Sequence, residues 1–171
     1  MNEQTYVIWL EFDDEFTTFL DEKCQELKVN NIASGIRPPH MTLTFVKTDN
    51  RERLIAFTKN YLRKNIVDIV IDSIGQFLGG ILYYAPCVNS RLLNLHTGLC
   101  RGLCEFSELV WDLYYPDNWT PHIALTAELN DQDVLKAFSI MRRDFSRRIV
   151  SVKRILIWAY NGDGEKVYID V

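Results

Sequence analysis

The chain has 171 residues and a formal net charge of −4 at pH 7, with 47% hydrophobic and 25% charged residues. These proportions are typical of a globular protein with a sizeable core, and they argue against disorder or a fibrous repeat. The acidic balance argues against a protein that holds long duplex nucleic acid through its overall field, because such binding needs many Lys and Arg side chains to neutralise phosphates.

Hydrophobic periodicity predicts seven strands and four helices. Pro38-Pro39 and Pro121 bar helix and introduce strands, and Gly79-Gly80 is typical of a two-residue hairpin turn. The strands are expected over 6–12, 40–46, 66–77, 81–84, 120–127, 149–160 and 166–171, and the helices over 15–27, 50–63, 90–106 and 131–145.

The order of these elements nearly repeats, and no linker or low-complexity segment divides the chain. We therefore predict one α+β domain over residues 1–171, with two similar halves, antiparallel sheets and helices outside. No hydrophobic run reaches the roughly 20 residues that cross a bilayer, and no export signal is recognisable. Four cysteines without a CxxC pair fit reduced thiols. We expect a cytoplasmic monomer that binds no membrane.

Two of the three histidines follow a proline at the start of an alternating segment. Side chains alternate between the two faces of a strand. In the first segment His40, Thr42 and Thr44 are therefore expected on one face, with Leu43 and Phe45 pointing toward the core.

The second segment has the same pattern. His122, Ala124 and Thr126 are expected on one face, while Ile123 and Leu125 point to the other. Each predicted strand thus has an apolar face and a polar face that begins with histidine.

This pair resembles the two-histidine (2H) phosphoesterase superfamily, also labelled the 2′-5′ RNA ligase or RNA cyclic phosphodiesterase family. Its signature is two His-x-Thr/Ser-x motifs about half a chain apart. His40-Met41-Thr42-Leu43 matches fully, and His122-Ile123-Ala124-Leu125 matches except at the hydroxyl position. The resemblance implies a bilobal fold with pseudo-two-fold symmetry, in which two mainly antiparallel sheets face a central cleft.

The resemblance also implies a hydrolase for nucleotide or RNA-end phosphodiesters, for example one that opens a 2′,3′-cyclic phosphate to a 2′-phosphate. Ligase-like reversal, small cyclic nucleotides and ADP-ribose cyclic phosphate stay open as reactions or substrates. His40 and His122 are the expected acid–base pair, with either one as the base.

The chemistry explains why two imidazoles suffice. A phosphodiester is cleaved when a base deprotonates the nucleophile and an acid protonates the leaving oxygen. With an ordinary pKa of about 6.5, one histidine can be neutral while the other is charged. Thr42 is expected to donate to the phosphoryl oxygens. We predict no metal and no other cofactor.

Ala124 departs from the motif, because alanine cannot donate a hydrogen bond. Thr126 lies on the same expected face, about 7 Å further along, and is the candidate to bind phosphate in its place. Losing one preorganised donor typically costs on the order of a hundredfold in rate. The alternatives are a nucleotide or RNA-end binding protein of this fold without efficient turnover, and a structural protein in which the histidines are incidental.

Further candidate contacts with substrate are Arg37, next to the first motif, and the aromatic residues Trp9, Tyr84 and Tyr115. His96, Cys100 and Cys104 form a row at helical spacing that could hold a metal. We interpret this row as the packing face of the helix, since no second cluster completes a tetrahedral set.

Overall fold

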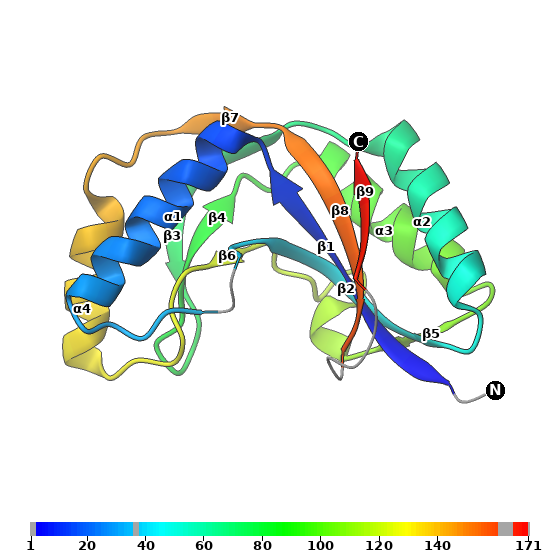
Figure 1. Ribbon diagram of the computed structural model, residues 1–171, viewed down its shortest axis with the longest axis horizontal. Coiled ribbons are helices and arrows are strands. Elements are labelled where there is room, and N and C mark those ends of the chain that lie inside the picture. Colours follow the sequence, from blue (N-terminus) through cyan, green and yellow to red (C-terminus); the bar gives the residue numbers. More distant parts are fainter. Residues whose placement is uncertain (1–2, 36–37, 161–165, 171) are drawn as a thin grey trace.

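The structure is a computed structural model that describes residues 3–35, 38–160 and 166–170. Strands and helices follow one another as two interleaved halves, shown in Figure 1. The elements are β1 (Gln4–Phe12), α1 (Asp14–Val29), β2 (Met41–Thr48), α2 (Arg51–Asn65), β3 (Ile69–Gln76), β4 (Leu82–Pro86), α3 (Ser90–Leu103), β5 (Glu108–Val110), the 3₁₀ helix η1 (Asp112–Tyr114), β6 (Ile123–Ala124), α4 (Asp131–Arg142), β7 (Arg148–Val150), β8 (Val152–Ala159) and β9 (Val167–Asp170).

The described strands form one nine-stranded sheet in which every pairing is antiparallel. Its order is β7-β3-β4-β6-β2-β1-β8-β9, with β5 paired to β2 off this path. The short strand β6 joins the two halves, because it pairs with β4 on one side and with β2 on the other. The two sheets expected from the sequence are therefore the two halves of a continuous, strongly curled sheet.

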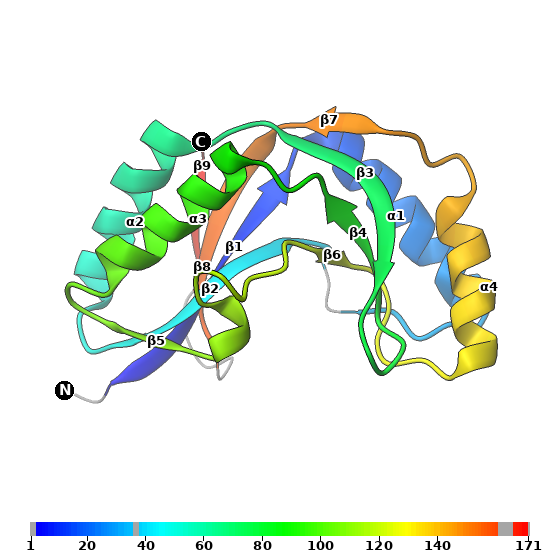
Figure 2. The ribbon, with the colours of Figure 1, turned by 180° about the vertical axis from the view of Figure 1, so that it is seen from behind.

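Helices cover the outer side of each half. The α1 and α4 helices pack together over the half that contains β3 and β4, whereas α2 and α3 pack together over β2 and β5. Figures 1 and 2 show one helix pair at each end of the molecule and the curved sheet between them. This arrangement confirms the predicted α+β class with helices outside. Within the described residues, no helix is long and apolar enough to cross a bilayer.

The helices begin where the sequence offers a cap. Each follows an Asp or Asn whose side-chain oxygen accepts a hydrogen bond from the backbone N–H three residues later, which satisfies a donor that the first helical turn leaves free. The four caps are Asp13, Asn50, Asn89 and Asn130.

The strand predicted over 120–127 is regular only at Ile123–Ala124. Pro121 has no N–H to give to a ladder. Beyond β6 the backbone N–H of Leu125 donates to Leu82 O at 3.0 Å, and Thr126 forms an isolated bridge with Ser34. The second histidine motif therefore lies at a short seam between the two halves.

The strand predicted over 149–160 is two strands that serve different halves. β7 pairs with β3, and β8 pairs with β1. Between them Ser151 leaves the ladder and donates its backbone N–H to the Asp13 carboxylate at 2.8 Å. The chain thus crosses from one half to the other at Ser151.

Candidate functional site

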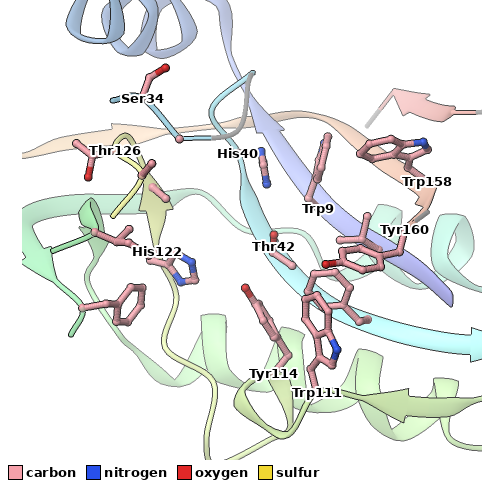
Figure 3. Close-up of a pocket in the computed structure, with 17 residues that line it drawn as sticks. Trp9, Ser34, His40, Thr42, Trp111, Tyr114, His122, Thr126, Trp158 and Tyr160 are labelled. Atoms are coloured by element: carbon pink, nitrogen blue, oxygen red, sulfur yellow. The ribbon is translucent and has the colours of Figure 1, made fainter. Parts of the chain in front are cut away.

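A cavity of about 950 Å³ lies on the inner side of the curled sheet. His40 and His122 both line it, together with Thr42 and Ala124. Figure 3 shows the two histidines on opposite sides of the same space. Aromatic rings form much of the remaining wall, namely Trp9, Phe45, Phe77, Trp111, Tyr114, Trp158 and Tyr160.

His40 immediately precedes β2 and stacks on Trp9, with ring centroids 3.8 Å apart and an interplanar angle of 24°. Its Nδ1 lies 2.8 Å from Pro38 O. A carbonyl oxygen only accepts, so Nδ1 carries the hydrogen and Nε2 is left for a ligand. Burial lowers the pKa of His40 to about 4, the bond to Pro38 opposes this shift, and the charge of His122 adds to it.

His122 repeats this geometry at the seam. Its Nδ1 donates to Thr120 O at 2.8 Å, again the carbonyl two residues earlier, and Nε2 is left without that bond. The ring meets Phe77 edge-on, with centroids 4.8 Å apart at 89°. Burial lowers the pKa of His122, and the bond to Thr120 opposes the shift. The sequence pairing of the two motifs is therefore matched by a pairing in space.

A β-bulge lies at Leu43, the last residue of the first motif. Trp9 pairs with Thr42, but Ile8 pairs with Thr44, so Leu43 is an extra residue in β2 without a partner in β1. A bulge of this kind shifts the alternation of the strand by one residue. Side chains after Leu43 therefore face opposite to what strict alternation predicts.

The bulge corrects the predicted faces of β2. Thr42 lines the cavity as expected, but Phe45 lines it as well. Thr44 is fully buried and interacts with the Cys100 thiol of α3, so it lies on the helix side. The polar face expected from the sequence is thus reduced to His40 and Thr42, followed by an aromatic ring.

The hydroxyl position of the second motif is empty, since Ala124 lines the cavity without a donor. Thr126 also lines the cavity, but it is only 2% exposed. Its hydroxyl accepts a hydrogen bond from the backbone N–H of Leu82 at 2.8 Å. Thr126 is therefore held by the backbone of β4, and its role in phosphate binding stays a prediction.

The other predicted substrate contacts lie in different places. Trp9 lines the cavity, and Arg37 lies outside the described residues. Tyr84 is fully buried and donates to Met141 O at 2.7 Å, because β4 turns it toward the helices. Tyr115 donates to Leu109 O at 2.6 Å, and neither tyrosine is among the residues that line the cavity. The structure therefore places both tyrosines outside this cavity, contrary to what the sequence suggested.

Aromatic residues of the β8 and η1 regions also line the cavity, although the sequence patterns did not predict them. Trp158 and Tyr160 line the cavity from the end of β8, and Trp111 and Tyr114 line it from η1. The two-residue spacing of Trp158 and Tyr160 was a usable signal. No local pattern indicated η1.

His96 is buried at 1% exposure. It stacks on Trp119 with centroids 4.0 Å apart, and its Nε2 lies 2.9 Å from Leu43 O. Burial lowers its pKa to about 4. Cys100 lies beside it, with Sγ 3.6 Å from Nε2, while Cys104 is exposed. In the part of the chain that the structure describes, no three His, Cys, Asp or Glu side chains are grouped as a metal site.

The sequence matches a known protein family. A model of the 2′-5′ RNA ligase superfamily matches residues 20–164. The chain belongs to this superfamily. The match confirms the resemblance to the 2H phosphoesterases, and no curated protein sequence matches significantly.

Solved structures show the same fold. E. coli LigT in complex with 3′-AMP superimposes with a TM-score of 0.60 at 14% identity, over 99% of this chain and 96% of LigT. LigT in complex with ATP gives 0.57 at 13%, over 100% and 96%. The crystal structure of a phosphoesterase gives a TM-score of 0.56 at 13% identity, over 98% of this chain and 95% of the phosphoesterase.

Membership in the 2′-5′ RNA ligase superfamily supports a phosphoesterase or RNA ligase-like enzyme. Within the superfamily signature, this member keeps both histidines and the first hydroxyl, and it carries Ala124 at the second. Among the described residues, no Lys or Arg lines its cavity.

Proposed function

We propose that this protein is a metal-independent phosphoesterase that hydrolyses cyclic phosphodiesters of nucleotides or RNA ends. The observation that carries the proposal is the shared placement of His40 and His122. Both rings line one cavity, and both Nδ1 atoms are bound to backbone carbonyls, so that two Nε2 atoms are left for one ligand.

The reaction needs only these groups. One neutral imidazole removes a proton from water as the water oxygen forms a new bond to phosphorus. The bond from phosphorus to the 3′-oxygen of a 2′,3′-cyclic phosphate breaks, and the second, protonated imidazole gives its proton to that oxygen. The product is a 2′-phosphate. Thr42 donates to a phosphoryl oxygen, where negative charge increases during the reaction.

Among the described residues, the lining of the cavity carries no Lys or Arg, which matches the single charge of a phosphodiester. A phosphodiester carries one negative charge, whereas a monoester carries close to two at pH 7. Without a Lys or Arg among the described lining residues, a second charge would be poorly compensated in this buried space. The same imbalance favours release of the monoester product.

The aromatic wall supports a nucleotide as the ligand. Bases stack on aromatic side chains with little dependence on sequence, and Trp9, Trp158 and Tyr160 lie on one side of the cavity in Figure 3. E. coli LigT, which has the same fold, has been crystallised with 3′-AMP and with ATP.

A panel of nucleoside 2′,3′-cyclic phosphates, incubated with EDTA and followed by ³¹P NMR, tests the proposal. General acid–base groups typically contribute 10²–10⁴-fold, so we expect losses of about this size in His40→Ala and in His122→Ala. Tyr115→Phe, which lies outside the cavity, is the control and should keep wild-type activity. Turnover that persists in both histidine variants would refute the mechanism.

A second function follows from Ala124. A protein that binds nucleotides or RNA ends without turning them over fits a cavity that has lost one hydroxyl of the signature. The same panel separates the two. No turnover by the wild type, combined with saturable binding measured by quenching of tryptophan fluorescence, would favour the binding protein.

A further inference from the structure

Ala124 leaves one side of the candidate phosphate site without a hydroxyl. In the first half of the site, Thr42 follows His40 by two residues and lines the cavity. In the second half, Ala124 follows His122 by two residues and offers only a methyl group. A donor for the second side has to come from another element.

Tyr114 brings a hydroxyl to this place. It lines the cavity from η1, and its ring centroid lies 6.4 Å from that of His122. Figure 3 shows its hydroxyl directed into the space between His122 and Thr42. The hydroxyl also interacts with the Thr42 side chain. Tyr114 and Thr42 therefore present two hydroxyls side by side.

The backbone around Tyr114 is fixed. Trp111, which precedes η1, has φ 68° and ψ 96°, a conformation that is costly for a residue with a side chain and that persists only when its surroundings enforce it. The backbone N–H of Tyr114 donates to Trp111 O at 2.9 Å. Phe45 packs against the tyrosine ring at 4.9 Å and 70°. A hydroxyl held in this way loses little conformational entropy when it binds a ligand.

The hydroxyl of Tyr114 is also in the right protonation state. Burial raises the pKa of Tyr114, and its interaction with Thr42 opposes this only in part. The phenol is therefore a donor throughout the neutral range. It carries no charge that would repel a phosphodiester.

The other hydroxyls of the cavity fit this position less well. Thr126 is 2% exposed and bound to the Leu82 backbone. Ser34 lies beside Thr126 through their isolated bridge. Tyr160 packs edge-on against Phe45 and Trp111, and in Figure 3 it lies on the side of Thr42 that faces away from His122. Among the described residues that line the cavity, Tyr114 is the one whose hydroxyl lies between His122 and Thr42 in Figure 3.

We propose that the Tyr114 hydroxyl donates to the phosphoryl group in place of the hydroxyl missing at Ala124, so that Thr42 and Tyr114 form the donor pair of this site. The proposal rests on the proposed phosphodiester ligand. It makes Tyr114, from outside both histidine motifs, a residue that contacts the substrate.

A double-mutant cycle tests the substitution. Removing one preorganised donor costs on the order of a hundredfold in rate, so Tyr114→Phe should lower kcat/KM by about that factor. Ala124→Thr should change wild-type kcat/KM by less than about threefold, but it should restore at least about tenfold in the Tyr114→Phe background. Tyr115→Phe, which removes a hydroxyl from the adjacent residue outside the cavity, should match the wild type.

Two outcomes of the cycle would overturn the proposal. One is a Tyr114→Phe variant within about twofold of the wild type. The other is an Ala124→Thr gain of equal size in both backgrounds, because independent positions add. Thermal melting of each variant verifies that it is folded.

Binding of inorganic phosphate, followed by ³¹P NMR at pH 6, keeps the proposal testable if no cyclic phosphodiester is turned over. Tyr114→Phe should weaken phosphate binding several-fold, with Tyr115→Phe unchanged. Such a result without turnover would refute the proposed reaction and keep the donor pair. Equal binding by the wild type and Tyr114→Phe, or none by the wild type, would overturn the donor pair itself.

Discussion

We predict that Trp9 lowers the pKa of His40 by covering its ring. The rings stack at 3.8 Å, Trp9 is 3% exposed, and burial is the main reason that the pKa of His40 falls from 6.5 to about 4. At pH 7 a group with a pKa of about 4 is protonated in about one molecule in a thousand, whereas a group with a pKa of about 6.5 is protonated in about one in four. Burial therefore keeps His40 neutral at pH 7.

Trp9→Ala tests this cause. Uncovering the ring removes the desolvation that disfavours the imidazolium, so the pKa of His40 should rise from about 4 toward 6.5. If the rise is complete, the protonated fraction at pH 7 grows about two-hundredfold. The C–H resonances of the imidazole, followed by NMR from pH 3 to 8 and assigned with His40→Ala, report the value directly.

Trp158→Ala is the matched control. Trp158 also lines the cavity and lies 6.0 Å from Trp9 in an edge contact, but its ring does not stack on His40. Its removal should leave the His40 titration close to that of the wild type. A wild-type His40 that titrates near 6.5, or a folded Trp9→Ala variant that keeps the wild-type pKa, would refute the role of Trp9.

Three other measurements follow from the same structure. Burial lowers the pKa of both His40 and His122, so the bell-shaped pH dependence of kcat/KM should have its maximum below pH 6.5, and a maximum at pH 7 or above would contradict it. The pKa of His96 is about 4 when folded and about 6.5 when unfolded, so the unfolded state binds the extra proton and stability falls as pH drops through this window. About 2 kcal/mol of the unfolding free energy should be lost between pH 7 and pH 5 through this histidine, and urea denaturation of His96→Gln should show a correspondingly smaller difference. Gly80 and Gly79 both have positive φ, at 84° and 89°, but they differ in the space around them. A Cβ added at Gly80 would lie 2.2 Å from a backbone carbonyl oxygen, whereas a Cβ added at Gly79 would lie 3.7 Å from its nearest atom. Calorimetry should therefore show a larger loss of Tm for Gly80→Ala than for Gly79→Ala.

The predictable features of this protein are those with a local cause. An amphipathic period and an Asp or Asn cap are local signals that predict a helix. All four helices occur close to their expected ranges. The histidine motifs are equally local, because a proline and an alternating segment place each His at the start of a strand. Their shared cavity follows from the near-repeat in the order of elements.

The features that escaped prediction depend on contacts between distant segments. The strand breaks at Ser151 because β7 and β8 belong to different halves. Between them, the Asp13 carboxylate accepts a hydrogen bond from the backbone N–H of Ser151. The sequence suggested that Tyr84 faces the cavity. The pleat of β4 instead turns its side chain to the helix side, where Met141 O accepts a hydrogen bond from the Tyr84 hydroxyl. Tyr114 and Tyr115 are adjacent, and only the path of η1 decides which one enters the cavity.

A single extra residue in β2 links several of these features. Without the bulge at Leu43, Thr44 would face the cavity and Phe45 the helices, as strict alternation predicts. The bulge instead places Phe45 in the cavity, where it packs against the ring of Tyr114.

The same bulge leaves Leu43 outside the register with β1, and its carbonyl accepts a hydrogen bond from the buried His96. One inserted residue thus removes a second threonine from the first motif's face and supports the tyrosine next to Thr42. The asymmetry of this site is therefore built into the first half of the chain as well as into Ala124. A Thr at position 124 alone would restore the signature but not a symmetric site.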